Sequence, residues 1–316
     1  MKTNHIQRTA PRAAVALRDA STSEVVEYYV AQEDVKDSSK KLYTRTLRLF
    51  FAWVDNEGKQ IAQLTKADIV EYKNSLFEKG LSSLSVASYL TSLRKFYEWA
   101  ESEKLYPNIV KGVKTPRRVQ AFKNHHLTEE KSSELLQHYE ALSLRDYAII
   151  NLILRTGLRT VEVVRADVGD ITFKGNRRIL KVWGKGKNEK DDFVVLTDKA
   201  YEPIAAYLRT RKGAKPGEPL FSSDSNRNSG ERLTTRTISG ICKSGLKAIG
   251  LDGREFTAHS LRHTTAVMIL KNGGELTEAQ AVLRHVSPAT TQIYTESIKE
   301  ELRLKDAPES RLDNVF

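Results

Sequence analysis

The spacing of apolar residues constrains the fold of this chain more than any other feature. Between residues 21 and 104 they recur every three or four positions in four blocks, which indicates four amphipathic helices. Ser38 and Thr65 could each accept a hydrogen bond at a helix start, and Gly80 follows the third block. We therefore expect a helical domain over residues 21–104. The blocks are Val25, Val26 and Tyr29; Leu42, Leu49, Phe50 and Trp53; Ile69, Tyr72 and Leu76; and Val86, Leu90, Leu93 and Tyr97.

The second part of the chain begins with helices and then changes its period. Thr128 is placed to cap a helix, and an apolar helix is expected over residues 147–154. Apolar residues then alternate in three short runs, ITF, RILKVW and DFVVL, and the turn at residues 184–188 joins the last two. Helical segments return afterwards. We therefore expect a mainly helical domain over residues 127–298 with a small antiparallel β-sheet inside it.

The charge of the chain points to a polyanionic partner. There are 51 Lys and Arg against 40 Asp and Glu, a formal net charge of +11. Such an excess favours nucleic acid, although a basic surface alone does not decide it. The one cysteine, Cys242, excludes an internal disulfide and suits a reducing compartment. No apolar run approaches the ~20 residues that span a bilayer, so we expect a cytoplasmic, DNA-associated protein without a membrane segment.

Three segments lie outside the two expected domains. Residues 1–20 are polar and Ala-rich, which indicates a flexible leader. Residues 105–126 contain three Pro or Gly breaks and several cations, which indicates a basic interdomain linker. Residues 299–316 are too short and too weakly apolar to pack alone, so they should dock elsewhere. The linker cations that we expect to contact DNA are Lys111, Lys114, Arg117 and Arg118.

Six residues of the second domain together suit phosphoryl transfer. Cleavage of a phosphodiester without water needs a nucleophile, cations around the nonbridging oxygens and an acid for the leaving oxygen. Two arginines, a lysine, two histidines and a tyrosine supply all of these. They are Arg159, Lys185, His259, Arg262, His285 and Tyr294.

These residues stand in motifs whose order resembles the tyrosine recombinase family, which includes Xer proteins and phage integrases. The motifs are TGLRTVE (156–162), WGKGKNEK (183–190), HSLRH (259–263) and LRHVSPATTQIY (283–294), behind the four-helix N-terminal part. The resemblance covers residues 21–298. It implies a mainly α fold with a small antiparallel sheet, in which a four-helix core-binding domain and a mixed α/β catalytic domain form a C-shaped clamp on DNA.

The resemblance also assigns roles to the arginines and the first histidine. Arg159 matches the first catalytic arginine, whose planar fork suits two phosphate oxygens. Glu162 lies one helical turn later, where it could brace that arginine. His259 and Arg262 match the histidine and the second arginine, and their spacing of three places them on one helical face.

The remaining roles belong to the proton donor and the nucleophile. By resemblance, Lys185 protonates the leaving 5′ oxygen and Tyr294 forms the covalent bond. His285 lies nine residues before Tyr294, the separation expected of the last phosphate-binding histidine. A tyrosine with a pKa near ~10 is a poor nucleophile, so it needs cations and a base, for which His259 is the candidate.

Taken one at a time, these residues have ordinary structural explanations. Arg159 alone could form a surface ion pair, the turn around Lys185 could be merely solvated, and Tyr294 could pack in a core. One position departs from the family, which has Gly before the last histidine where this chain has Arg284. If that position needs a positive φ, Arg carries a steric cost that Gly avoids, and Arg284 could instead touch phosphate.

No metal or nucleotide cofactor is expected. His259 and His263 have the spacing of a zinc-binding helix, but no glutamate lies between them and the neighbouring Arg262 would repel a cation. His263 is expected to be a packed, hydrogen-bonded residue. The spacing GxxxxGK[ST] of a nucleotide-binding loop is absent around Lys185.

The resemblance implies a site-specific recombinase that passes through a 3′-phosphotyrosine and a four-way junction. Four protomers on two DNA sites would carry out the exchange, with residues 299–316 packed on a neighbouring protomer. Two alternatives stay open: a type IB topoisomerase, which reseals the same strand, and a non-catalytic DNA-binding protein. The sequence does not distinguish integration, inversion and resolution.

Overall fold

A computed structural model describes residues 20–117, 125–183, 189–226 and 228–285, together with residues 287, 291, 298, 299, 303, 304, 307, 313 and 315. The chain divides into two compact units, residues 1–121 and 122–316. Each unit has a hydrophobic core of its own. None of the described helices is both long and apolar enough to cross a membrane.

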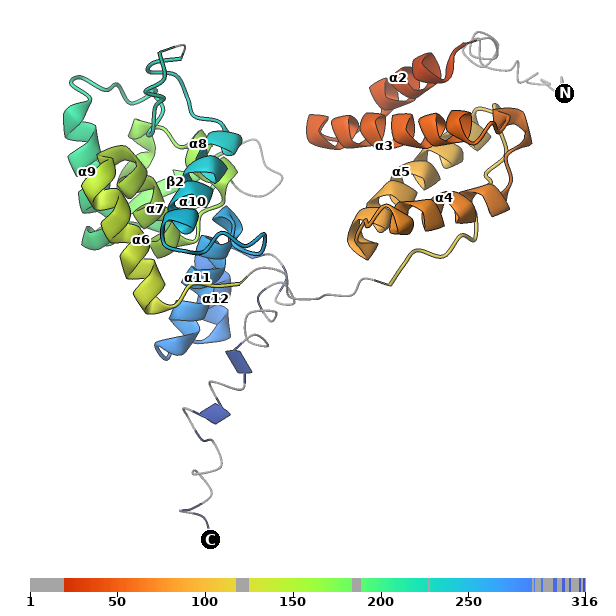
Figure 1. Ribbon diagram of the computed structural model, residues 1–316. Coiled ribbons are helices and arrows are strands. Elements are labelled where there is room, and N and C mark those ends of the chain that lie inside the picture. Colours follow the sequence, from red (N-terminus) through yellow and green to blue (C-terminus); the bar gives the residue numbers. More distant parts are fainter. Residues whose placement is uncertain are drawn as a thin grey trace, which may run out of the picture. The chain divides into compact units, whose positions relative to one another are not determined.

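The first unit is helical, as predicted. Its elements are α2 (Thr22–Gln32), α3 (Asp37–Asn56), the 3-10 turn η1 (Ile61–Gln63), α4 (Lys66–Glu78) and α5 (Ser83–Ser102) (Figure 1). Thr65 caps α4 in a reciprocal capping box with Asp68, and Gly80 follows that helix in a left-handed conformation with φ of +77°. The prediction for Ser38 is wrong. The N-cap of α3 is Lys36, so Ser38 lies inside the first turn.

Aromatic side chains fill the core of this unit. Phe50 is fully buried and meets Tyr72 and Tyr97 edge to face, with ring centroids 5.0 and 6.3 Å away. The same core takes in Val110 and Val113, which lie within the predicted linker. Residues as far as Val113 therefore pack on the first unit, because these valines reach its apolar interior.

The second unit is mainly helical with one small sheet, which confirms the predicted fold class. Strands β1 (Ile171–Lys174), β2 (Arg177–Val182) and β3 (Asp192–Val195) form an antiparallel sheet in the order β1-β2-β3. Ile171 pairs with Leu180, which in turn pairs with Val194. The helices are α6 (Glu129–Leu142), α7 (Leu144–Thr156), α8 (Thr160–Arg165), α9 (Asp198–Thr210), α10 (Thr235–Ala248), α11 (Ala258–Lys271) and α12 (Leu276–Leu283), and η2 (Val168–Asp170) is a 3-10 turn.

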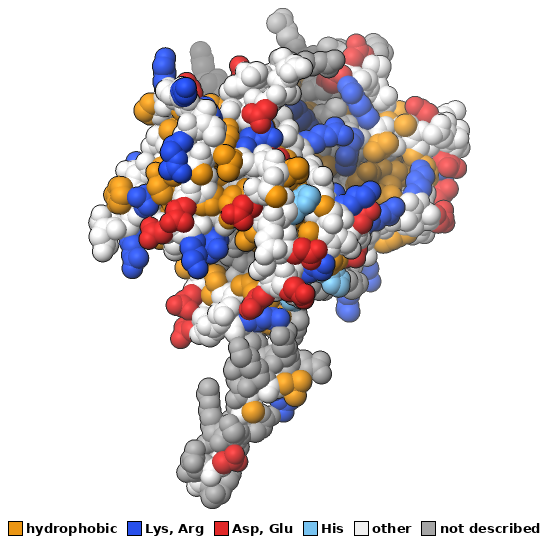
Figure 2. Space-filling model, turned by 60° about the vertical axis from the view of Figure 1, so that its left-hand side comes forward, with side chains coloured by type: hydrophobic (Ala, Val, Ile, Leu, Met, Phe, Trp, Pro, Cys, Tyr) orange, Lys and Arg blue, Asp and Glu red, His pale blue; other side chains and the backbone are white. Residues whose placement is uncertain are grey.

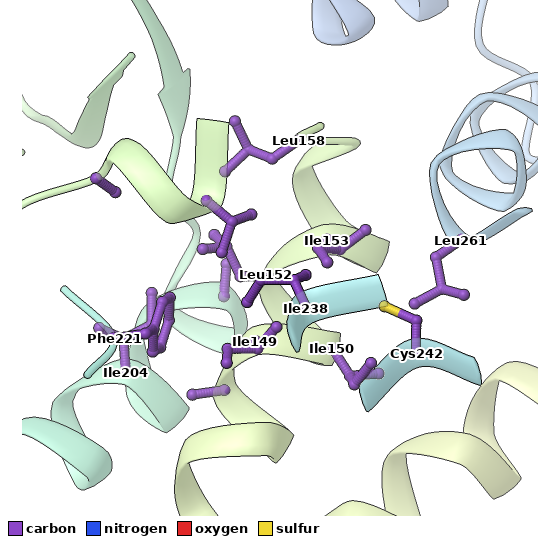
Figure 3. Close-up of a cluster of buried hydrophobic side chains, with 14 of the residues drawn as sticks. Ile149, Ile150, Leu152, Ile153, Leu158, Ile204, Phe221, Ile238, Cys242 and Leu261 are labelled. Carbon is purple, nitrogen blue, oxygen red and sulfur yellow. The ribbon is translucent and has the colours of Figure 1, made fainter. Parts of the chain in front are cut away.

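Helix α7 lies at the centre of the second core. It contacts α6, α9, α10 and α11, and its side chains Ile149, Ile150, Leu152 and Ile153 are fully buried (Figure 3). Cys242 of α10 points into the same cluster, and burial raises the pKa of its thiol to about 12. It is a small core residue. Thr128 caps α6 by accepting a hydrogen bond from the backbone of Lys131, which was predicted.

Candidate active site

The loop that carries Arg159 is shaped by a glycine. Gly157 ends α7 in the left-handed conformation, with φ of +61°, and Arg159 then caps α8 with extended backbone. A Cβ added to Gly157 would lie 2.4 Å from Cδ2 of Leu283 at the end of α12. Only a residue without a side chain lets these two segments approach so closely, so Gly157 brings the TGLR and LRH motifs together.

Arg262, in the HSLRH motif, contacts both of these motifs. Its side chain projects from α11, where the residue is 1% exposed. One terminal nitrogen donates to the carbonyl of Gly157, and the other donates to the carbonyl of Leu283 at 2.5 Å. Three segments far apart in the sequence therefore meet at one guanidinium.

The predicted contact between Glu162 and Arg159 is present. Nη1 of Arg159 donates to Oε1 of Glu162 at 2.9 Å, and the backbone N–H of Arg159 donates to Oε2 at 2.7 Å. The Glu162 side chain is 7% exposed and that of Arg159 is 31% exposed. The buried carboxylate of Glu162 thus holds the guanidinium of Arg159, which is partly exposed to solvent.

A hollow of about 560 Å³ lies beside these residues. It brings together three of the predicted residues, Arg159, His259 and Arg262, and also Lys243. Two arginines and a lysine around one concave surface suit an anion such as phosphate. Elsewhere basic and acidic side chains are interspersed in the view of Figure 2, so net charge alone does not locate the site. The other lining residues are Leu158, Thr160, Val161, Ser239, Thr257 and Ala258.

The histidines around this hollow favour their neutral forms. Partial desolvation, followed by the charges of Arg262 and Arg159, lowers the pKa of His259 from its ordinary value. Burial lowers the pKa of His285 to about 4, with further contributions from Arg262, Arg159 and His259. A neutral imidazole is able to accept a proton, which is the property a general base needs.

Hydrogen bonds fix the position of His285. Its Nδ1 lies 2.9 Å from Oγ1 of Thr291, which is fully buried, and its carbonyl accepts a hydrogen bond from the side chain of Gln280 at 3.1 Å. The charges of Arg159 and Arg262 and the neighbouring His259 also act on this ring, so His285 lies near the residues that line the hollow.

His263 packs next to His259, with ring centroids 4.9 Å apart. Burial lowers its pKa to about 3. Among the described residues, no three His, Cys, Asp or Glu side chains gather into a group that could hold a metal ion.

Family models cover both units of the chain. The model described as "Phage integrase family" matches residues 125–301, and "Phage integrase, N-terminal SAM-like domain" matches residues 6–104. The chain belongs to the phage integrase family. The recombinase is 30% identical to tyrosine recombinase XerC of Leptospira interrogans, over 88% of this chain and 89% of that protein. It is 29% identical to tyrosine recombinase XerD of Listeria monocytogenes, over 88% and 94%.

Solved structures of recombinases share the fold. XerH bound to its difH substrate in a post-cleavage complex matches with a TM-score of 0.71 and 20% identity, over 95% of this chain and 90% of that one. A lambda integrase dimer bound to a core site matches with a TM-score of 0.66 and 18% identity, over 91% and 81%. Both share the fold of a helical N-terminal unit followed by a mainly helical unit with a small sheet.

Three of the recombinase's predicted site residues, Lys185, Tyr294 and Arg118, lie outside the described residues. The other linker cations, Lys111, Lys114 and Arg117, are exposed. Their contact with DNA stays a prediction.

Sequence reasoning missed Lys243. Its Nζ donates to the carbonyls of Asp252, Gly253 and Phe256 at 2.9, 2.7 and 3.3 Å, so it holds the loop that leads into α11 and His259. Nothing in the sequence indicates these contacts, because every residue has a backbone carbonyl and the acceptors therefore leave no pattern of residue types. Thr257, also missed, caps α11 in a box with Ser260, and that local pattern was available in the sequence.

Proposed function

We propose that this recombinase cleaves and rejoins double-stranded DNA at specific sites through a 3′-phosphotyrosine formed by Tyr294. The observation that carries the proposal is the convergence of Arg159, His259 and Arg262 on one hollow, with His285 beside the same cations. Membership in the family supplies the reaction class. The relatives named XerH and lambda integrase are described with DNA bound, which supports DNA as the partner.

The chemistry follows from the charges around the hollow. The Tyr294 hydroxyl oxygen attacks phosphorus, its proton passes to the neutral ring of His259, and the bond to the 5′ oxygen breaks. Arg159, with Arg262 and His285, stabilises the negative charge on the nonbridging oxygens. Lys185 gives a proton to the departing 5′ oxygen. The phosphotyrosine retains the energy of the phosphodiester, so the free 5′ hydroxyl of the partner duplex can attack it without a nucleotide cofactor.

A basic groove on the first unit provides a second surface for DNA. It runs along α3, has a volume of about 620 Å³ and carries the exposed cations Lys41, Arg45 and Arg48. These cations recur at helical spacing on one face, as a surface that follows a phosphate backbone requires. With the exposed linker cations, they support the proposal that the units at residues 21–104 and 127–298 clamp the duplex.

Strand exchange requires more than one copy of the chain. We assign to the recombinase a homotetramer on paired sites, a four-way junction intermediate and action on DNA in the cytoplasm of a bacterial or phage-carrying cell. The tail at residues 299–316 would connect neighbouring protomers.

The decisive experiment is covalent trapping on a nicked suicide substrate, from which a short fragment is lost so that religation fails. The wild type should form a protein–DNA adduct through Tyr294, and Tyr294→Phe should bind the DNA without forming one. Tyr28→Phe is the matched control, because Tyr28 is 38% exposed on α2 of the other unit. An adduct with Tyr294→Phe would refute the nucleophile. Relaxation of supercoils without recombinant products would instead identify a topoisomerase.

A further inference from the structure

Arg284 occupies a position that disfavours its residue type. It ends α12 in the left-handed conformation, with φ of +53° and ψ of +47°, where a Cβ crowds the backbone. Its side chain is nevertheless 7% exposed. A long charged side chain in a strained and buried position immediately before His285 needs compensating contacts, because a buried charge without partners is costly.

The guanidinium of Arg284 finds these contacts on three elements. Nη2 lies 2.7 Å from Oε2 of Glu162 on α8, Nη1 donates to the carbonyl of Val282 at 2.9 Å, and Nε lies 3.6 Å from Oδ2 of Asp192 on β3. The Glu162 side chain is as buried as that of Arg284, at 7%. The pair is therefore shielded from water, and removing one partner would leave the other charge buried with fewer contacts.

Glu162 is shared between two arginines. Its Oε1 accepts from Nη1 of Arg159, while its Oε2 faces Arg284. An isolated arginine–glutamate pair has no net charge, so Glu162 alone would weaken the attraction of Arg159 for a phosphate. A second guanidinium on the other carboxylate oxygen adds a positive charge beside Glu162, partly offset by Asp192 at 3.6 Å from its Nε, and prevents the carboxylate from turning.

We propose that Arg284 is a positioning residue, which holds Glu162 so that the guanidinium of Arg159 is fixed at the scissile phosphate. This inference rests on the proposed function of Arg159. Arg284 itself does not line the hollow, and its guanidinium is engaged by the buried carboxylate of Glu162 and the carbonyl of Val282.

The test compares two substrates under single-turnover conditions at saturating DNA. One carries the ordinary scissile phosphate, and the other a methylphosphonate, in which a methyl group replaces one nonbridging oxygen and removes the negative charge. Loss of a cation that acts on that charge slows cleavage of the phosphate more than cleavage of the methylphosphonate. Arg284→Gln should slow the phosphate reaction about tenfold, the equivalent of about 1.4 kcal/mol, with little change on the methylphosphonate or in the Kd for DNA.

Three further variants make the result decisive. Arg284→Gly relieves the backbone strain at this position, which offsets part of the cost of losing the ion pair with Glu162, and it should still show the defect. Arg211→Gln is the matched control. Arg211 pairs with Glu218 at 2.9 Å in the same unit but does not line the hollow, so its loss should not distinguish the substrates. Arg159→Gln is the positive control for the substrate effect.

Equal defects of Arg284→Gln on both substrates, or full activity of Arg284→Gly on the phosphate, would overturn the inference. If Arg159→Gln also fails to distinguish the substrates, the role proposed for Arg159 is wrong. The two failures are therefore separable.

Discussion

Replacing Gly157 by Ala tests whether the close approach of two motifs holds the candidate active site together. The added Cβ would lie 2.4 Å from Cδ2 of Leu283, and φ at this position is +61°. Leu283 cannot easily move aside, because it is fully buried in a cluster with Val267, Leu270 and Ile298. Gly157→Ala therefore combines backbone strain with overpacking.

The structure offers a control that separates these two costs. Gly175, in the turn between β1 and β2, has φ of +59° and nothing within 4 Å of an added Cβ. Gly175→Ala should lower the free energy of unfolding by the backbone cost alone, about 1–2 kcal/mol. Gly157→Ala should carry the same backbone cost and a further loss of about 1–3 kcal/mol from displacement of Leu283. Both glycines lie in the second unit, so the difference between the two costs does not depend on the stability of the first unit.

The measurement is calorimetric unfolding of the full chain, together with the rate of adduct formation. Gly157→Ala should also slow cleavage, because the carbonyl of Gly157 accepts a hydrogen bond from Arg262. Leu283→Ala removes the clashing atom, so in that background Gly157→Ala should cost no more than Gly175→Ala. Equal costs of the two glycine substitutions in the wild-type background would refute the reasoning.

Two further predictions concern binding and assembly. Replacing Lys114, Arg117 and Arg118 together by Ala should weaken DNA binding and reduce the slope of log K against log salt by about 2–3, while bound DNA is still cleaved; an unchanged slope in a salt titration would exclude phosphate contacts by these residues. Deleting the chain after Ile298, which is 2% exposed in the cluster of α11 and α12, should preserve binding of a single site but reduce paired-site complexes and recombination. Normal paired complexes in a gel-shift assay would contradict the second prediction.

Features set by neighbours in the sequence were the ones that could be predicted. The capping box of Thr65 with Asp68 and the contact of Glu162 with Arg159 each span three residues, so helical geometry alone brings the partners together. Ser38 was misassigned for a related reason. Asp37, Ser38 and Ser39 are consecutive polar residues at a helix start, and their order does not reveal that the helix begins at the first of them.

Features that depend on packing could not be read from the sequence. Val110 and Val113 lie among proline and glycine, and only the core of the first unit explains why they are buried. The departure from glycine at Arg284 indicated a strained backbone. The contact of Arg284 with Glu162, by contrast, joins residues 122 positions apart, so only the folded structure reveals it.

The difference in exposure between the two arginines determines what their substitution can reveal. Arg262 is 1% exposed and joins the carbonyls of Gly157 and Leu283, so its removal leaves buried acceptors and separates the loops that carry Arg159 and His285. Loss of activity would then mix a folding defect with a chemical one. The side chain of Arg159 is 31% exposed and is held mainly by Glu162, so its replacement disturbs the fold less. Arg159 is therefore the better position at which to measure how much a cation contributes to cleavage.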